Sequence, residues 1–339
     1  RSVGRSLGGG GVTYGGRDMS FYGPFQAMAA ICLQALGQVL YTYFLSGIPE
    51  PVFVFGSFLV TALILNLKNG FNIPRRDYAL LIRNNVYTAI TYICFFFALR
   101  ELDPSVVVAI DTGVALIVGA FADSIKRRAW PSPRRLTICA GILVACLLLG
   151  ARQFDGAGHN GLTRLSIWLA MAATAVTGAS SALTMSVCAE LAERGWSRSE
   201  IVSQRFYLTV CATLVWCLVF PGALHLPVDG RTIGIAAIVT VTGVMLPMLL
   251  LQSAVQLCGP FAVLVCMSVQ PFISLLLSTS SSLQAFDWRT AVGIAMVSLL
   301  VIYDVAADRP APRRPRTTAA DLSRPAASDD STAAPRPAV

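Results

Sequence analysis

The sequence has few charged residues and almost no histidine. Only 13% of its 339 residues are charged and histidine occurs twice, whereas an average soluble domain has about 25% charged residues. The motifs HExxH and GxxxxGK[ST] are absent, and the Gly-x-Ser-x-Gly match at residues 4–8 lies in a Gly-rich stretch outside every apolar run. These features argue against a zinc protease, an intramembrane serine hydrolase of the usual kind and ATP drive by this chain itself.

Long apolar runs take the place of charge. Hydrophobic residues make up 55% of the chain, the mean hydropathy is +0.65, and no polar stretch is long enough for a separate soluble domain. Because about 20 apolar residues cross a bilayer, we expect an all-α integral membrane protein with ten transmembrane helices. The expected spans are residues 22–45, 51–67, 78–99, 104–123, 135–151, 166–189, 201–220, 232–256, 260–279 and 288–305.

The ten segments fall into two sets of five, and the fourth members of the two sets are similar. They read DPSVVVAIDTG at residues 103–113 and GPFAVLVCMSV at residues 259–269. Because five is odd, the second set enters the bilayer upside down, which predicts two inverted five-helix repeats, an architecture of alternating-access carriers. The expected order is a disordered Gly-rich N-terminus (1–21), the first repeat (22–151), the second repeat (166–305) and a disordered Pro/Ala/Arg-rich tail (306–339).

Lysine and arginine are distributed unevenly over the expected loops. With the amino terminus in the cytoplasm, 19 of them lie on the cytoplasmic side and five on the other side. This asymmetry predicts that both termini are cytoplasmic. The net charge of +8 is then explained by anionic membrane lipids, and no basic patch interleaved with aromatics predicts nucleic-acid binding. The nine cysteines lie almost all in apolar runs without a CxxC motif, so we expect buried hydrophobes and no metal site.

Asp111 is the most informative polar residue within the expected spans. It lies about 10 Å along the fourth span, and a carboxyl at that depth can take up and release a proton as a cavity opens to each side. The alternative is a neutral carboxyl that only joins two helices by a hydrogen bond. The equivalent residue of the second repeat is Met267, so no second acid completes a pair.

Weaker candidates for the substrate and proton pathway are a proline interruption and two amides. Gln270 and Pro271 interrupt the ninth span, because proline removes a helix hydrogen bond and exposes backbone. Gln34 and Gln38 share one face of the first span, four residues apart. Side-chain amides also join helices without any contact to substrate.

Three further polar residues lie toward the cytoplasmic ends of their spans. Asn85 and Gln252 are candidate substrate contacts in the third and eighth spans. Arg205, in the seventh span, could reach the membrane surface, pair with Glu190 or hold an anionic substrate. We favour the first two interpretations of Arg205.

Two sequence stretches carry a resemblance to a known family. FALRELDPS at residues 97–105 and LQSAVQLCGP at residues 251–260, set in two halves of five spans, resemble the EamA-type drug/metabolite transporter superfamily. Over residues 22–305 the resemblance implies a central cavity between spans one to four and six to nine, with spans five and ten as supports. It also implies export or exchange of small metabolites such as amino acids, without a cofactor. Many members carry a Gly-Glu pair that residues 119–123 and 277–280 lack, so no role of that glutamate is carried over.

We therefore expect a secondary transporter of a small organic metabolite, such as an amino acid or drug-like solute, that works by alternating access with proton coupling as one means of drive. A lipid flippase and an intramembrane enzyme are the alternatives, and an enzyme would need several acids or histidines at one depth. Expected partners are the small-molecule substrate and membrane lipids, no metal or cofactor is expected, and a homodimer stays open. The expected location is a bacterial cytoplasmic membrane.

Overall fold

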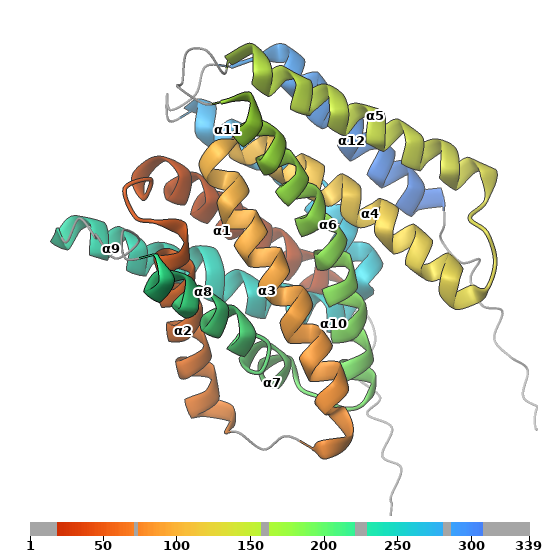
Figure 1. Ribbon diagram of the computed structural model, residues 1–339. Helices are drawn as coiled ribbons and strands as arrows, with labels where there is room; N and C mark the ends of the chain where they lie inside the picture. The colour runs from red at the N-terminus through yellow and green to blue at the C-terminus, as the bar shows by residue number, and fades with distance from the viewer. Residues whose placement is uncertain (1–18, 71–73, 157–162, 221–228, 281–285, 308–339) are drawn as a thin grey trace, which may run out of the picture.

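The computed structural model describes residues 19–70, 74–156, 163–220, 229–280 and 286–307, and within these ranges every regular element is a helix (Figure 1). The expected disordered ends lie outside these ranges, except that residues 19–21 begin the first helix and residues 306–307 end the last. The elements are α1 (Met19–Phe44), α2 (Glu50–Asn69), η1 (Arg75–Asp77), α3 (Tyr78–Glu101), α4 (Pro104–Arg127), α5 (Pro133–Gly156), α6 (Arg164–Glu193), α7 (Arg198–Ser203), α8 (Tyr207–Val219), α9 (Gly230–Ile238), η3 (Val239–Met245), α10 (Leu246–Met267), α11 (Gln270–Ser280) and α12 (Trp288–Ala307).

The helices have the length and surface of membrane spans. Within the described ranges, eight helical stretches are long and apolar enough to cross a bilayer, and a shorter apolar helix covers Val265–Ser280. Outward-facing positions expose large apolar side chains such as Leu67, Leu148 and Leu218, which a water-exposed surface rarely collects in number. The chain is therefore an all-α membrane-embedded protein, and the count of ten spans stays a prediction.

Three expected spans are interrupted. The seventh is divided into α7 and α8 by residues 204–206, and the eighth contains the π-helical segment η3. The ninth is interrupted at residues 268–269, where the chain leaves the helix. The prediction of a loop at residues 257–259 is wrong, because α10 continues through these residues to Met267. The residues on either side of Gly259 and Pro260 are apolar, and helices in membranes tolerate such residues where neighbours satisfy the backbone.

Close packing between helices depends on glycine. α1 packs along η3 and α10, and α3 packs along α6. A Cβ atom on Gly37 would lie 2.4 Å from the Cα atom of Gly243 in η3, and one on Gly178 would lie 2.5 Å from the carbonyl oxygen of Asp111. Only glycine permits such backbone approach, the usual device for packing helices in lipid.

Helix α3 joins two ends of the bundle that differ in composition. It has 24 residues, so these ends are about 36 Å apart. The aromatic end, where α3 finishes, consists of a buried cluster that includes Tyr41, Leu45, Phe53, Phe96 and Leu102. The polar end, where α3 begins, contains η1, the end of α2, and the turn between α6 and α7.

Helices α5 and α12 form a separate pair beside α4 (Figure 1). They share an apolar cluster with α4 that includes Ile142, Leu149 and Val297. An ion pair joins them, with 3.3 Å between Arg135 Nε and the buried Asp304 Oδ2. The pair leaves the centre of the bundle to the remaining helices.

Candidate functional site

A cavity lies between α1, α3, α4, α6 and α10 and reaches the break between α7 and α8. It contains about 820 Å³ of space between atoms, including its open mouth. It extends from Asp111 to Cys188 and Val255. Arg198 Nη1 at the polar end donates a hydrogen bond of 2.6 Å to Ser253 Oγ, two residues from Val255, so the cavity extends toward the polar end. The lining residues are Gln34, Thr91, Tyr92, Phe95, Asp111, Thr177, Ser181, Thr184, Met185, Cys188, Arg205, Met248, Leu251, Gln252, Val255 and Met267.

Asp111 lines this cavity from α4, where it is half-buried. Helix α4 begins at Pro104, so Asp111 sits two turns inside the helix. Ser181 Oγ of α6 donates to Asp111 Oδ1 over 3.5 Å, at the outer limit of a hydrogen bond. Met267, the predicted equivalent in the second repeat, lines the same cavity. Among the described lining residues, Asp111 supplies the only carboxylate.

Arg205 brings a positive charge to the same cavity from the break between α7 and α8. Its Nε donates to Thr88 Oγ1 over 3.2 Å, and its guanidinium lies 6.0 Å from the ring centre of Tyr92 and 5.6 Å from that of Phe206. Glu190 instead pairs with Arg194, the residue directly after α6, so of the alternatives for Arg205 the pairing with Glu190 is wrong. The interpretations favoured from the sequence did not place Arg205 in a cavity, because the seventh span was expected to be one continuous helix.

Two asparagines build the break that presents Arg205. Asn85 Nδ2 donates to the Gln204 carbonyl over 2.7 Å, and Asn85 Oδ1 accepts from the Leu208 amide over 3.2 Å. Asn66 Nδ2 donates to the Ser203 carbonyl over 3.2 Å. These bonds satisfy backbone groups that a broken helix would leave unpaired in lipid. Asn85 therefore holds the backbone and does not line the central cavity, and its predicted contact with substrate stays a prediction.

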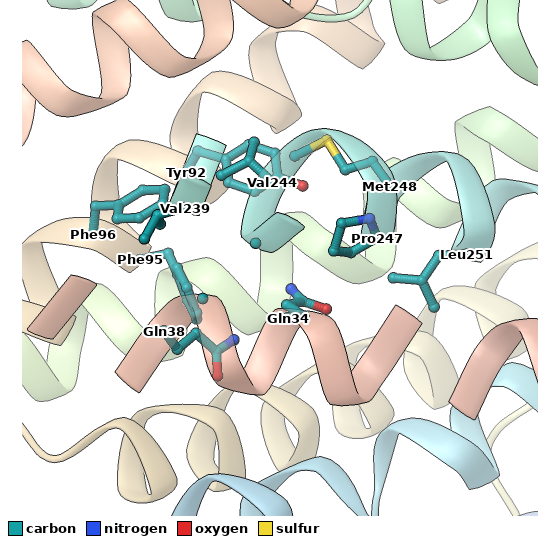
Figure 2. A pocket seen from close by; sticks show the side chains of 12 residues that line it. Gln34, Gln38, Tyr92, Phe95, Phe96, Val239, Val244, Pro247, Met248 and Leu251 are labelled. Atoms are coloured by element: carbon teal, nitrogen blue, oxygen red, sulfur yellow. The ribbon is translucent and has the colours of Figure 1, made fainter. Parts of the chain in front are cut away.

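Three of the four predicted glutamines lie at the cavity or beside it. Gln34 and Gln252 line the cavity, and Gln34 and Gln38 line an adjoining, smaller one (Figure 2). Ser274 Oγ donates to Gln38 Oε1 over 3.3 Å. Gln34 Oε1, Gln38 Nε2 and Gln252 Nε2 are buried without a hydrogen-bond partner among the described residues. Buried amide groups without partners are costly, so they are available to a polar solute or to water.

The π-helical segment forms the opposite wall of the adjoining cavity. Val239, Gly243 and Val244 of η3 line it together with Pro247, and Figure 2 shows Pro247 across the pocket from Gln34. Proline has no N–H to donate to the carbonyl of the preceding turn, and a wider helical turn accommodates that loss. No periodicity in the sequence predicts this segment.

Gln270 and Pro271 are buried at the start of α11 and line neither cavity. Pro271 stands in the first turn of α11, where its missing N–H removes no helix bond. The break before it leaves the Ser268 carbonyl available, and Ser298 Oγ of α12 donates to that carbonyl over 2.6 Å. The backbone at this break is thus satisfied by protein, and the predicted contact of Gln270 and Pro271 with substrate stays a prediction.

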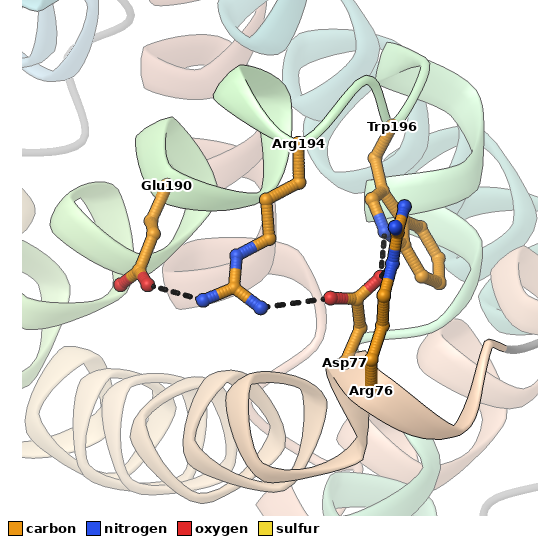
Figure 3. A network of polar contacts seen from close by, with 5 residues as sticks. All are labelled: Arg76, Asp77, Glu190, Arg194 and Trp196. Carbon is orange, nitrogen blue, oxygen red and sulfur yellow. Dashed lines mark hydrogen bonds and ion pairs between the residues drawn. The ribbon is translucent and has the colours of Figure 1, made fainter.

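An ion-pair network joins α3 to the end of α6 at the polar end (Figure 3). The buried Asp77 carboxylate accepts from Arg194 Nη1 over 2.9 Å and from Trp196 Nε1 over 3.0 Å, and Arg194 Nη2 donates to Glu190 over 2.9 Å. The hydrogen bond to Asp77 raises the pKa of Arg194, so this side chain stays charged. The network fixes the distance between the beginning of α3 and the end of α6.

No metal centre is formed by the described residues. All nine cysteines are free, and no group of three or more His, Cys, Asp or Glu side chains in the described ranges could hold a metal ion. His159 and His225 lie outside those ranges.

Comparison with known proteins gives a fold and no family. No family model and no curated protein sequence matches the chain. Among 26 matching chains of solved structures is one described only as the crystal structure of a protein. It superposes with a TM-score of 0.60 at 11% sequence identity, over 85% of this chain and 99% of the other. At that identity the likeness shows a shared fold alone.

Proposed function

We propose that this protein is a secondary carrier of a small organic solute, an exporter or exchanger that works by alternating access with Asp111 as the proton-coupling residue. One observation carries the proposal. Asp111 of α4 and Arg205 of the break between α7 and α8, from opposite halves of the chain, line one cavity inside a bundle of membrane helices. Ionisable groups at such depth are costly and mark solute or proton pathways.

The lining of the cavity has the chemistry of a site for a small metabolite. Apolar side chains such as Tyr92, Phe95 and Leu251 make up half of its sixteen lining residues, and the other eight are polar or charged. Such a lining offers an organic solute both apolar surface and hydrogen-bonding groups.

The helix contacts support two inverted five-helix repeats. If α1, α3 and α4 correspond to α6, α10 and α11, the packing of α1 on α10 is the counterpart of the packing of α6 on α3. The contact of α5 with α12 and that of α4 with α11 then join equivalent helices. Exchange of contacts between halves is the pattern expected for a rocking carrier, and with the EamA resemblance it supports ten spans.

The polar end is proposed to face the cytoplasm of a bacterial cell. The loops at this end carry many of the chain's basic side chains, as positive-inside orientation requires. They are Lys68, Arg75, Arg76, Arg194 and Arg198. Both termini then lie in the cytoplasm, and solute enters the described conformation from that side.

Flux measurements test the proposal. The native chain, Asp111→Asn and Glu193→Gln are each purified and reconstituted in proteoliposomes. The flux of a pool of labelled metabolites is then measured with and without a pH gradient. Glu193 is an exposed acid at the end of α6 that lines neither cavity, so it is the matched control. We expect gradient-dependent flux in the native chain and the control and its loss in Asp111→Asn. Absence of flux for every solute would contradict a carrier.

A lipid flippase is the second candidate. The observation in its favour is a shallow, almost wholly apolar groove between α3 and α8, lined by Ile82, Val86 and Leu208 among others. None of the residues lining this groove lines the central cavity, so a lipid headgroup has no common surface with Asp111. Reorientation of a labelled phospholipid in the same vesicles, without solute flux, would favour the flippase.

A further inference from the structure

We propose that Arg205 and Gln252 form a carboxylate-binding subsite, so that the solute carried is a small organic carboxylate with an apolar body. This inference rests on the proposed carrier function, because it names the chemical class of the solute held in that cavity.

Arg205 has hydrogen-bonding capacity that its protein contacts do not use. A guanidinium has five N–H donors and no acceptor, and the structure gives one bond, from Nε to Thr88 Oγ1 at 3.2 Å. Among the described residues no carboxylate forms an ion pair with Arg205. An arginine charge inside a membrane protein without an acidic partner favours a bound anion.

The contacts of Arg205 orient its free donors. Thr88 is fully buried and holds Nε from the α3 side, while the rings of Tyr92 and Phe206 flank the guanidinium. The backbone on which Arg205 stands is fixed by Asn85 and Asn66, as described above. The side chain is therefore positioned before a ligand arrives, which lowers the cost of binding.

Gln252 supplies a second donor from another helix. Its side chain is only 6% exposed, its Nε2 has no partner among the described residues, and it lines the same cavity as Arg205. The bond between Arg198 and Ser253 holds this part of α10 against α7. A carboxylate has two oxygens with lone pairs on both sides, so it can accept from a guanidinium fork and an amide together.

Asp111 gives the cavity a direction. Its carboxylate repels a second anion when ionised, so the carboxylate of a solute is favoured at Arg205 and disfavoured beside α4. The aromatic and aliphatic wall contributed by Tyr92, Phe95 and Leu251 suits an apolar body between these two groups. The predicted ligand is thus an organic carboxylate with apolar atoms adjacent to the acid group.

A charge series on constant carbon skeletons tests the subsite. Purified protein in detergent is titrated with 4-methylpentanoate, 4-methylpentanamide and 4-methylpentylamine, and with phenylacetate, phenylacetamide and 2-phenylethylamine, and thermal stabilisation is followed. We expect stabilisation by at least one carboxylate and by neither matching amide nor amine. Arg205→Gln should weaken the binding of that carboxylate at least tenfold, and Gln252→Ala should weaken its binding by a smaller factor. Arg83→Gln is the control, since Arg83 is exposed on α3 and lines no described cavity.

The outcomes separate this inference from the carrier itself. Binding of amides or amines alone, no binding of either carboxylate, or carboxylate binding that survives both substitutions would each overturn the subsite. If a neutral or cationic solute is transported and this flux is lost in Asp111→Asn, the proposal of a carrier stands and the proposal that its solute is a carboxylate is overturned. If Arg205→Gln lowers the melting temperature of the ligand-free protein severely, Gln252→Ala decides the question.

Discussion

The two ends of the helix bundle are closed by different kinds of contact. At the aromatic end Tyr41, Phe53 and Phe96 meet with ring centres 4.8 to 5.3 Å apart. At the polar end Asp77 holds Arg194 and Trp196 through directional hydrogen bonds. Among the described residues of the aromatic end, Arg100 also forms an ion pair with Glu50 near the surface.

The difference indicates which end can open. Separating packed rings forfeits many small dispersion contacts that nothing replaces, and exposes apolar surface to water. Hydrogen bonds between protein groups can be exchanged for bonds to water at small net cost. The cavity extends toward the polar end, so in this conformation it lies toward the end whose contacts can be exchanged for contacts with water.

The largest expected effect belongs to the ring packing. Phe58 is fully buried, and its ring centre lies 4.6 Å from that of Tyr92 and 4.9 Å from that of Phe206. Phe58→Ala should destabilise the fold by about 3 kcal/mol or more, because it leaves a cavity among rings. Thermal unfolding in detergent measures the loss. Phe25→Ala, at a side chain 62% exposed, is the control, and equal shifts in both variants would contradict the comparison.

A close approach of backbones gives the next largest effect. Gly37→Ala would place its methyl group 2.4 Å from the Cα atom of Gly243, so α1 and η3 must separate at a cost of about 1 to 3 kcal/mol. Gly56→Ala on α2 meets no atom within 4 Å and should be neutral or slightly stabilising. Thermal unfolding of the two variants decides, and the same melting temperature in both would show that the approach carries no packing energy.

The polar end should respond in accessibility more than in stability. Asp77→Asn removes the charge that holds Arg194, so the end of α6 should separate from α3 more often. In a background where the other eight cysteines are replaced, we expect faster maleimide labelling of Cys188, which is buried and lines the cavity. Arg75→Gln, at an exposed side chain of the same turn, should leave the rate unchanged. An unchanged rate in Asp77→Asn would show that this network does not close the cavity.

The smallest effect is expected for a polar contact located among the helices of the aromatic end. Asp229 caps α9, and hydrogen bonds from Thr232 lower the pKa of its carboxyl. A lowered pKa stabilises the folded state above the ordinary aspartate range, and this contribution is lost as pH falls below about 4. Relative to the intrinsic exchange rate at each pH, the hydrogen-exchange protection of the first turn of α9 should fall at low pH in the native chain, and Asp229→Asn should abolish this pH dependence while the melting temperature hardly changes.

The sequence predicts the class of fold and one cavity residue well, because both depend on composition and depth. Apolar runs specify membrane helices, and Asp111 is conspicuous since a carboxyl seven residues into a span is rare. Gln34 and Gln252, which the sequence also offers as candidates, line the cavity in the structure. Their amides could equally have joined helices.

The helix breaks could not be predicted in the same way. The break at residues 204–206 depends on Asn66 and Asn85, which are more than 100 residues away in the sequence. Without it Arg205 belongs to a continuous helix and is directed to the membrane surface. The break before Pro271 was predicted, but the hydroxyl of Ser298 that satisfies it comes from another helix. Periodicity describes one helix at a time, whereas these features arise from contacts between helices.

Labelling from the two sides of the membrane tests the central claim most directly. Ser181→Cys, beside Asp111, and Phe96→Cys, at the aromatic end, are made in a chain without other cysteines and treated with a membrane-impermeant thiol reagent in vesicles of each orientation. The account predicts that residue 181 reacts from the polar end alone and that residue 96 is protected from both sides. Reaction at residue 96 as fast as at residue 181, or reaction of residue 181 only from the aromatic end, would contradict it.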